Sequence, residues 1–204
     1  MSGIDRHLHK KLILSAVLVF MVNASAHART IDQNLARCEG NDADVAITAC
    51  TAVIGSGRLP QRALAAVYSN RGGAHLKKQA YALAIADFDQ AITLDPTNAT
   101  NVHNRGFAFE TTGKLDEAIR DYSRAIEFNP DHTVSYSNRG RAYERLGQHE
   151  RALQDLSRYI TLAPRDVRAF DQRGTSMRAE VISSARSRIS TRWFASRPTA
   201  RPVT

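Results

Sequence analysis

The sequence predicts an all-α fold, an α-solenoid in which antiparallel helix pairs stack one after another along the chain. Three observations predict it. A glycine recurs every 34 residues, at Gly72, Gly106, Gly140 and Gly174. A proline recurs at the same interval, at Pro96, Pro130 and Pro164. Between these positions apolar residues fall at helical spacing, and a fixed period of this length is typical of stacked repeats.

Residues 1–28 have the composition of a secretory signal peptide. A basic start precedes an apolar run at 12–22, and small residues in Ala-x-Ala order follow, so cleavage is expected after Ala28 or Ala26. The run is shorter than the ~20 apolar residues that a spanning helix needs. We therefore expect an exported protein, periplasmic or secreted, without a stable membrane span after cleavage. The alternative is that the uncleaved segment anchors the chain.

The next segment, 29–64, holds the two cysteines of the chain, Cys38 and Cys50. In an exported protein a lone pair of cysteines favours a disulfide. Two thiols cannot complete a tetrahedral zinc site, no histidine lies close by in the sequence, and the Cys-x-x-Cys spacing of catalytic dithiols is absent. We expect a structural disulfide and no metal site.

Residues 65–98, 99–132 and 133–166 are predicted to be three complete repeats. In the second half of each, an alanine is followed four residues later by a large apolar residue: Ala84 and Phe88, Ala118 and Tyr122, Ala152 and Leu156. Small residues let two helix axes approach closely, and the large residue fills the groove that results. The closing proline ends the second helix, because the residue before a proline is disfavoured in the α region. Each repeat should therefore be two antiparallel helices joined by a short turn.

These columns of glycine, alanine, aromatic residue and proline resemble the tetratricopeptide repeat family. The likeness is strongest to small exported bacterial proteins of that family that carry Asn-Arg-Gly in each first helix. The resemblance implies a right-handed superhelix whose first helices line the concave face. It also implies that 29–64 contains a degenerate helix pair with the disulfide and a connector. Residues 167–180 would then form a partial fourth repeat or capping helix.

Residues 181–204 depart from the repeat pattern. They contain five arginines, no lysine and no acidic residue. We expect a disordered tail. One hypothesis is that the reading frame shifted near residue 180, and another is that the arginines bind anionic surfaces. Since the rest of the mature chain is nearly neutral, the high pI is no evidence for a basic nucleic-acid-binding body, and no nucleic-acid partner is expected.

The sequence lacks the motifs that usually carry catalysis. It contains no His-Glu-x-x-His pair, no Gly-x-Ser-x-Gly elbow and no phosphate-binding Gly-x-x-x-x-Gly-Lys loop. The repeats also leave no room for a separate catalytic domain. We predict that the protein is not an enzyme and needs no cofactor.

The recurring Asn-Arg-Gly tripeptide supplies the candidate binding site. Its arginines, Arg71, Arg105, Arg139 and Arg173, are expected to pack along a neighbouring helix and form surface ion pairs. The resemblance places its amides on the concave face, at Asn70, Asn104, Asn138 and Gln172. An amide both donates and accepts hydrogen bonds, so such a ladder can hold the backbone of an extended peptide of any sequence. It resembles the asparagine ladder of the O-linked N-acetylglucosamine transferase, which holds an extended polypeptide. The alternative is that each asparagine bonds to the adjacent helix.

Five further residues are predicted to line the same groove: His103, Phe107, Arg141, Glu144 and Arg168. We therefore predict a non-catalytic adaptor or scaffold of the bacterial envelope, which binds an extended peptide or a partner segment in this groove. One alternative is a structural protein that forms homo-oligomers through an uncapped C-terminal helix. The other is a protein whose arginine-rich tail binds anionic surfaces.

Overall fold

The structure, a computed structural model, describes residues 30–195 and the side chains of 30–186. The described residues are helical apart from short connecting segments and include no strand. This confirms the predicted all-α solenoid of helix pairs. The chain divides into two compact units, Met1–Pro96 and Thr97–Thr204, and each is described by itself. The predicted signal peptide, 1–28, lies outside the described residues.

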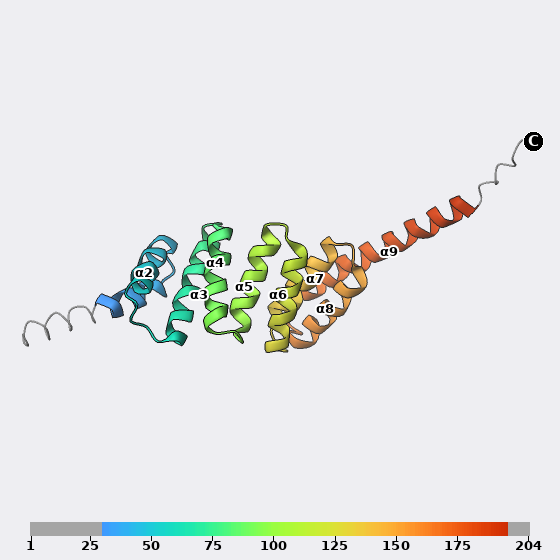
Figure 1. The fold of residues 1–204 in the computed structure, drawn as a ribbon. Coiled ribbons are helices and arrows are strands. Elements are labelled where there is room, and N and C mark those ends of the chain that lie inside the picture. The colour runs from blue at the N-terminus through green and yellow to red at the C-terminus, as the bar shows by residue number, and fades with distance from the viewer. Residues whose placement is uncertain (1–29, 196–204) are drawn as a thin grey trace, which may run out of the picture. The chain divides into compact units, whose positions relative to one another are not determined.

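The first unit consists of a short helical stretch at 30–38 followed by α2 (Ala43–Gly55), α3 (Gln61–Lys77) and α4 (Tyr81–Leu94). Asp42 caps α2, because its carboxylate accepts hydrogen bonds from the first free backbone N–H groups of the helix. Consecutive helices of the unit pack side by side (Figure 1).

The second unit continues the alternation with α5 (Ala99–Thr111), α6 (Leu115–Phe128), α7 (Thr133–Arg145), α8 (His149–Leu162) and α9 (Val167–Ala195). Each of these helices packs against the next in sequence (Figure 1). The second helices of the three repeats, α4, α6 and α8, begin at residues 81, 115 and 149 and so keep the 34-residue period of the sequence.

The recurring glycine marks where the two helices of a repeat approach each other most closely. A Cβ atom placed on Gly106 would lie 3.1 Å from the ring of Tyr122, and one on Gly72 would lie 3.0 Å from the ring of Phe88. Both rings are completely buried. Since real Cβ atoms rarely tolerate such distances, only glycine lets the large residue of the second helix approach the first helix this closely.

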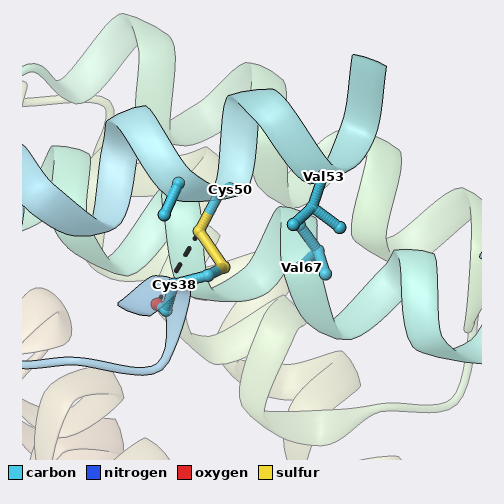
Figure 2. Packing of buried hydrophobic residues seen from close by; sticks show 5 residues of the cluster. Cys38, Cys50, Val53 and Val67 are labelled. Atoms are coloured by element: carbon cyan, nitrogen blue, oxygen red, sulfur yellow. Dashed lines mark hydrogen bonds between the residues drawn. A yellow bond between two sulfur atoms is a disulfide. The ribbon is translucent and has the colours of Figure 1, made fainter. Parts of the chain in front are cut away.

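A disulfide between Cys38 and Cys50 joins the stretch at 30–38 to α2, as predicted. Both cysteines are buried and pack with Val53 and Val67 in the core of the first unit (Figure 2). Closing a loop of this length stabilises a fold by about 3 kcal/mol in the chain-entropy account. The covalent link therefore holds together a helix pair that lacks the glycine and aromatic residue of the complete repeats.

The arginine of each complete Asn-Arg-Gly copy forms a two-pronged ion pair with an aspartate of the second helix. Arg139 donates from Nε and Nη2 to the two carboxylate oxygens of Asp155, at 2.8 Å each. Arg71 bonds to Asp87 and Arg105 bonds to Asp121 in the same way. The aspartate side chains are only 6–8% exposed. The expected ion pairs are therefore present, but they lie between the helices and not on the surface.

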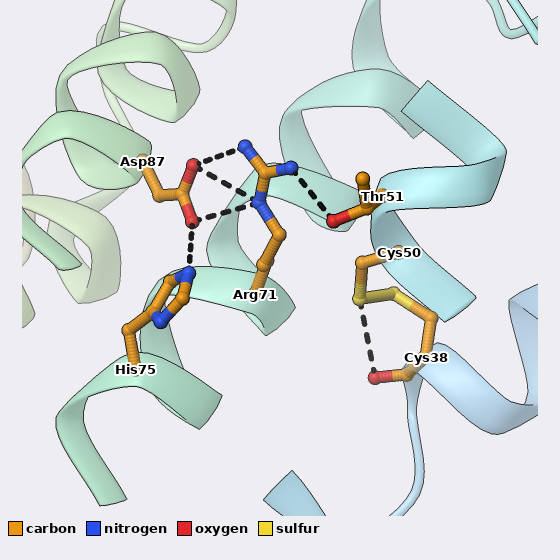
Figure 3. Close-up of a disulfide and its surroundings, with 6 residues drawn as sticks. All are labelled: Cys38, Cys50, Thr51, Arg71, His75 and Asp87. Atoms are coloured by element: carbon orange, nitrogen blue, oxygen red, sulfur yellow. Dashed lines mark hydrogen bonds and ion pairs between the residues drawn. A yellow bond between two sulfur atoms is a disulfide. The ribbon is translucent and has the colours of Figure 1, made fainter. Parts of the chain in front are cut away.

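The third nitrogen of the same guanidinium reaches the preceding repeat. Nη1 of Arg71 donates to the hydroxyl of Thr51 on α2 at 3.0 Å (Figure 3). Nη1 of Arg139 donates to the hydroxyl of Ser123 on α6 at 2.8 Å. In both cases one side chain ties together three helices.

The last helix, α9, differs from the prediction. A helix was expected over 167–180 and a disordered tail after it, but α9 continues as one helix to Ala195. In the two preceding repeats a glycine with left-handed backbone, Gly113 or Gly147, follows the end of the first helix and lets the chain turn. The corresponding position is Val181, and a β-branched residue does not adopt that conformation, so the turn is not made and the helix runs on. Residues 196–204 of the predicted tail lie outside the described residues.

The glycine column generates a prediction with an internal control. We expect Gly106→Ala to lower the free energy of unfolding by about 1–3 kcal/mol, because the added methyl group overpacks the contact with Tyr122. Gly174 faces no such contact, since the nearest atom to its Cβ position is the tip of Arg178 at 4.0 Å. Gly174→Ala should therefore raise stability by about 0.5–1 kcal/mol. Urea denaturation measures both, and equal effects would contradict the assignment.

The ion pairs generate a second prediction. Removing one member of a buried pair leaves a charge without its partner, so Asp155→Ala should cost about 2–4 kcal/mol. The double variant Arg139→Met, Asp155→Leu should cost less than Asp155→Ala alone, since it leaves no unpaired charge. Arg173→Met, in the copy without an aspartate partner, should change stability by less than about 0.5 kcal/mol. A large effect of Arg173→Met would show that the pairing is not what these arginines contribute.

Candidate functional site

The predicted groove residues come from four helices. Asn70 lies on α3 of the first unit. The other eight lie in the second unit: His103, Asn104 and Phe107 on α5, Asn138, Arg141 and Glu144 on α7, Arg168 and Gln172 on α9. The candidate site is therefore described on the second unit, where α5, α7 and α9 are the first helices of successive repeats.

Two of these residues are part of the packing between α5 and α7. His103 is 8% exposed, and its Nδ1 lies 2.9 Å from the hydroxyl of Ser135. The same hydroxyl lies 2.8 Å from Nδ1 of His132. The Asn138 amide nitrogen lies 3.5 Å from the other ring nitrogen of His103, and Asn138 is 7% exposed. His103 and Asn138 are thus buried hydrogen-bond partners within the fold.

A second polar cluster is centred on the buried carboxylate of Glu110. It accepts a hydrogen bond from the hydroxyl of Tyr122 at 2.8 Å and a two-pronged pair from Arg141 at 2.8 and 3.0 Å. Arg145 donates to the backbone carbonyl of Glu110 at 3.2 Å. Burial, reinforced by Glu110, raises the pKa of Tyr122, so its hydroxyl remains a donor. The cluster fixes the Arg141 side chain, which remains 42% exposed.

The amides of the predicted ladder lie in different environments. Asn70 and Asn104 are half-buried, whereas Asn138 is buried in the cluster above. Gln172 is half-buried, and its side-chain carbonyl accepts a hydrogen bond from Ser137 at 3.0 Å. For Asn138 the structure agrees with the alternative interpretation, in which the amide bonds within the fold. Whether the other three amides bind a peptide stays a prediction.

Two adjoining cavities lie along α7 and α9. The larger has a volume of about 420 Å³, and its lining includes Ser137, Asn138, Arg141, Arg168 and Gln172. The smaller has a volume of about 250 Å³, and its lining includes Arg141, Glu144, Asp171, Gln172 and Thr175. Arg141 and Gln172 line both cavities, so these two residues lie where the cavities meet.

The structure thus brings together five of the predicted groove residues: Asn138, Arg141, Glu144, Arg168 and Gln172. Phe107, His103 and Asn104 line neither cavity. Phe107 is 36% exposed on α5. Arg168 is held by Asp166, which accepts from its Nε and Nη2 at 3.0 and 2.8 Å.

Two further sets of polar residues hold the fold and the site together. The aspartates at 87, 121 and 155 recur with the 34-residue period and follow each arginine by 16 residues, a column that could have been found. Ser135 belongs to no such column, because the corresponding residue one repeat later is Ala169. Glu110 recurs as Glu144, but Glu110 pairs with Arg141 whereas Glu144 pairs with His149. Their roles depend on neighbours from other helices.

Within residues 30–186 no cluster of three or more metal-binding side chains occurs. Over the described part of the chain, no helix is both long and apolar enough to cross a membrane. The cavity walls offer amides, hydroxyl groups, arginines and carboxylates, which recognise polar and charged groups by hydrogen bonds.

The buried histidine generates a prediction for pH. Burial is the main cause that lowers the pKa of His103 from 6.5 to about 4. The nearby His132 and Arg141 also act to lower this pKa, whereas the charge of Glu110 opposes the shift. Between these values the unfolded chain takes up a proton that the folded chain does not. Stability must therefore fall as the pH falls through this window.

Between pH 7 and 5 this effect of His103 should lower the free energy of unfolding by about 2 kcal/mol. In His103→Gln the pH-dependent loss should be smaller by that amount, although the variant itself can be less stable at pH 7. Burial also lowers the pKa of His132, so part of the slope should remain. Urea denaturation at the two pH values measures the difference, and identical slopes would rule out a buried neutral His103.

The repeat region of this chain is similar to known proteins. Tetratricopeptide repeat models match residues 65–98 and 134–166, and a TPR repeat model matches 111–147. The described fold is similar to a crystal structure of MamA protein, with a TM-score of 0.68 and 21% identity over 78% of this chain and 86% of that one. It is also similar to the first TPR of Spaghetti (RPAP3) bound to an HSP90 peptide, with a TM-score of 0.56 and 28% identity over 57% of this chain and 93% of that one.

A curated relative, protein unc-45 homolog B of Danio rerio, is 41% identical over 56 residues. That match covers 28% of this chain and spans only 6% of the relative's length. The agreement between the repeat matches, the 34-residue helix register and the fold shows that the chain belongs to the tetratricopeptide repeat family.

Proposed function

We propose that this chain is an exported, non-catalytic adaptor of the bacterial envelope that binds an extended segment of a partner protein along α7 and α9. Tetratricopeptide repeats serve as protein-interaction modules, and the solved relative with 28% identity is bound to a peptide. Beyond this general role, we propose a binding face, an extended form of the ligand and a location in the envelope.

The observation that carries the proposal is the pair of adjoining cavities that share Arg141 and Gln172. Together they form a trough along two successive first helices, with polar side chains at its walls, and an extended peptide can follow such a trough. The Gln172 carbonyl already accepts from Ser137, which leaves its NH₂ group to donate to a peptide carbonyl. Arg141 is anchored by Glu110 through Nε and Nη2, so it offers a positioned guanidinium to an acceptor on the ligand.

Preorganisation supports the assignment of this face. Arg141 would lose little freedom on binding, because Glu110 already fixes its guanidinium, and Gln172 is likewise held by Ser137. By contrast, Asn138 is used within the fold, so we do not assign it a direct contact with the peptide backbone. The proposed ligand contacts are Arg141, Gln172 and the rim residue Arg168.

Export is supported by two features of the N-terminal segment. Residues 1–28 have the order of a signal peptide, with a basic start, an apolar run and an Ala-x-Ala sequence. The disulfide between Cys38 and Cys50 suits an oxidising compartment. Expression in a bacterium, with mass spectrometry of the mature N-terminus, tests this part. A chain that keeps residues 1–28 and stays in the cytoplasm would contradict it.

Selection of random 12-residue peptides against the full chain, followed by calorimetry on the peptides recovered, tests the binding face. We expect Gln172→Ala to weaken binding of a selected peptide by about 3–10-fold, the effect of one or two lost hydrogen bonds. Arg168→Ala should weaken the binding of those selected peptides that contain an acidic residue.

Matched controls lie on α8, outside both cavities. Gln154 and Arg158 are exposed, so Gln154→Ala and Arg158→Ala should leave peptide affinity unchanged. Circular dichroism confirms that each variant is folded. If Gln172→Ala and Gln154→Ala bind the selected peptides equally well, the trough is not the binding face. If no peptide is selected, an extended segment is not the ligand.

A further inference from the structure

The helix α9 carries the first half of a repeat without the second half. In the complete repeats, the arginine and glycine of Asn-Arg-Gly contact an aspartate and a large residue that are adjacent in the second helix. These adjacent pairs are Asp87 and Phe88, Asp121 and Tyr122, and Asp155 and Leu156. Each pair therefore acts as the complement of one arginine and one glycine.

In α9 the same arginine and glycine lack that complement. Arg173 and Gly174 keep the 34-residue register, but the residues 16 positions later are Ile189 and Ser190. Both lie within α9 itself, which continues as one helix to Ala195 and does not turn back. Among the described side chains, no carboxylate pairs with Arg173, and only the tip of Arg178 lies within 4.0 Å of the Gly174 Cβ position.

Exposed apolar residues flank the two. Phe170 and Met177 are each 49% exposed, one turn before and one turn after Gly174. The residue that corresponds to Phe170 in the second repeat, Val102, is completely buried. The adjacent side of α9 is packed, since Ala169 lies in a buried cluster with Leu156 and Tyr159 of α8. The unpartnered face of α9 is therefore the one that a second helix covers in each complete repeat.

We propose that this face, formed by Phe170, Arg173, Gly174 and Met177, binds an acidic amphipathic helix of another protein. The bound helix would carry an aspartate directly before an aromatic residue. The aspartate would pair with Arg173, and the aromatic ring would lie against Gly174 between Phe170 and Met177. The partner would complete the fourth repeat in trans. This surface differs from the α7 and α9 trough and does not depend on the function proposed for it.

Charge favours an acidic helix over a second copy of α9. The described side chains of α9 include four arginines, at 168, 173, 178 and 186, and two acids, at 171 and 180. Two α9 helices packed face to face would bring these basic side chains together. The chain's own aspartate and aromatic pairs cannot serve either, since Asp121 is 6% exposed and Tyr122 is fully buried in its own repeat. The complement must therefore come from a different molecule.

The test uses a labelled 14-residue peptide with the sequence of α6, LDEAIRDYSRAIEF, which carries four acids and two arginines. A hydrocarbon staple replaces the residues equivalent to Asp116 and Arg120, which are exposed in α6 and one turn apart. Circular dichroism establishes that the stapled peptide is helical. Fluorescence anisotropy then measures its binding to the full chain.

We expect saturable binding that is weakened at least tenfold by Arg173→Met or by Gly174→Leu, which fills the place of the aromatic ring. Replacing the aspartate of the peptide by asparagine should have an effect like that of Arg173→Met. The two changes together should cost little more than either one, because they remove the same interaction. Arg186→Met, which removes an exposed arginine elsewhere on α9, should leave binding within twofold.

Three outcomes would overturn the proposal. The helical peptide does not bind, or it binds Gly174→Leu as tightly as the parent chain. Alternatively, ultracentrifugation shows the chain to self-associate through a contact that Gly174→Leu abolishes, in which case the face is occupied by a second copy. None of these outcomes affects peptide binding by Gln172, so failure here is distinguishable from failure of the proposed function.

Discussion

The close approach of the two helices within each repeat is the constraint on which the rest of the structure depends. At Gly106 no side chain separates the helix backbone from the ring of Tyr122, and at Gly72 the same holds for Phe88. The adjacent arginine then fixes how far one helix slides along the other, because a two-pronged pair with a buried carboxylate has a single favourable geometry. The third nitrogen of Arg71 and that of Arg139 each bond to the preceding repeat. The tripeptide that recurs in the sequence is therefore first of all a packing element.

The same close packing determines which polar groups remain available for binding. Side chains on facing surfaces of α5 and α7 are buried, and buried polar groups must find partners within the fold. His103, Ser135 and Asn138 do so with one another, and Glu110 does so with Tyr122 and Arg141. The groups that remain accessible lie further along, between α7 and α9. There Arg141 and Gln172 are held in place by groups beneath or beside them and still reach a cavity.

At both ends of the repeat array this packing is incomplete, and the two ends are closed differently. At the N-terminal end the helix pair has no glycine and aromatic residue in register, and a disulfide joins it instead. At the C-terminal end Val181 occupies the position at which Gly113 and Gly147 turn the chain, so α9 does not fold back. Among the described side chains, its arginine and glycine consequently have no second helix against them. The N-terminal helix pair is closed by a covalent bond, whereas the described part of α9 has no second helix folded back against it.

The sequence by itself determined the repeat length, the helix pairs, the glycine against the aromatic residue, and the disulfide, because each of these depends on residues at fixed spacing or on a unique pair. It also contained the aspartate column, although spacing alone does not say which way a side chain points. Only the tertiary structure decided that Asn138 is buried while Asn104 in the same column is half-buried, and that Glu110 anchors Arg141. These differences arise because a side chain's environment in a stacked fold is set by neighbours from other helices, and those neighbours do not repeat identically from one unit to the next.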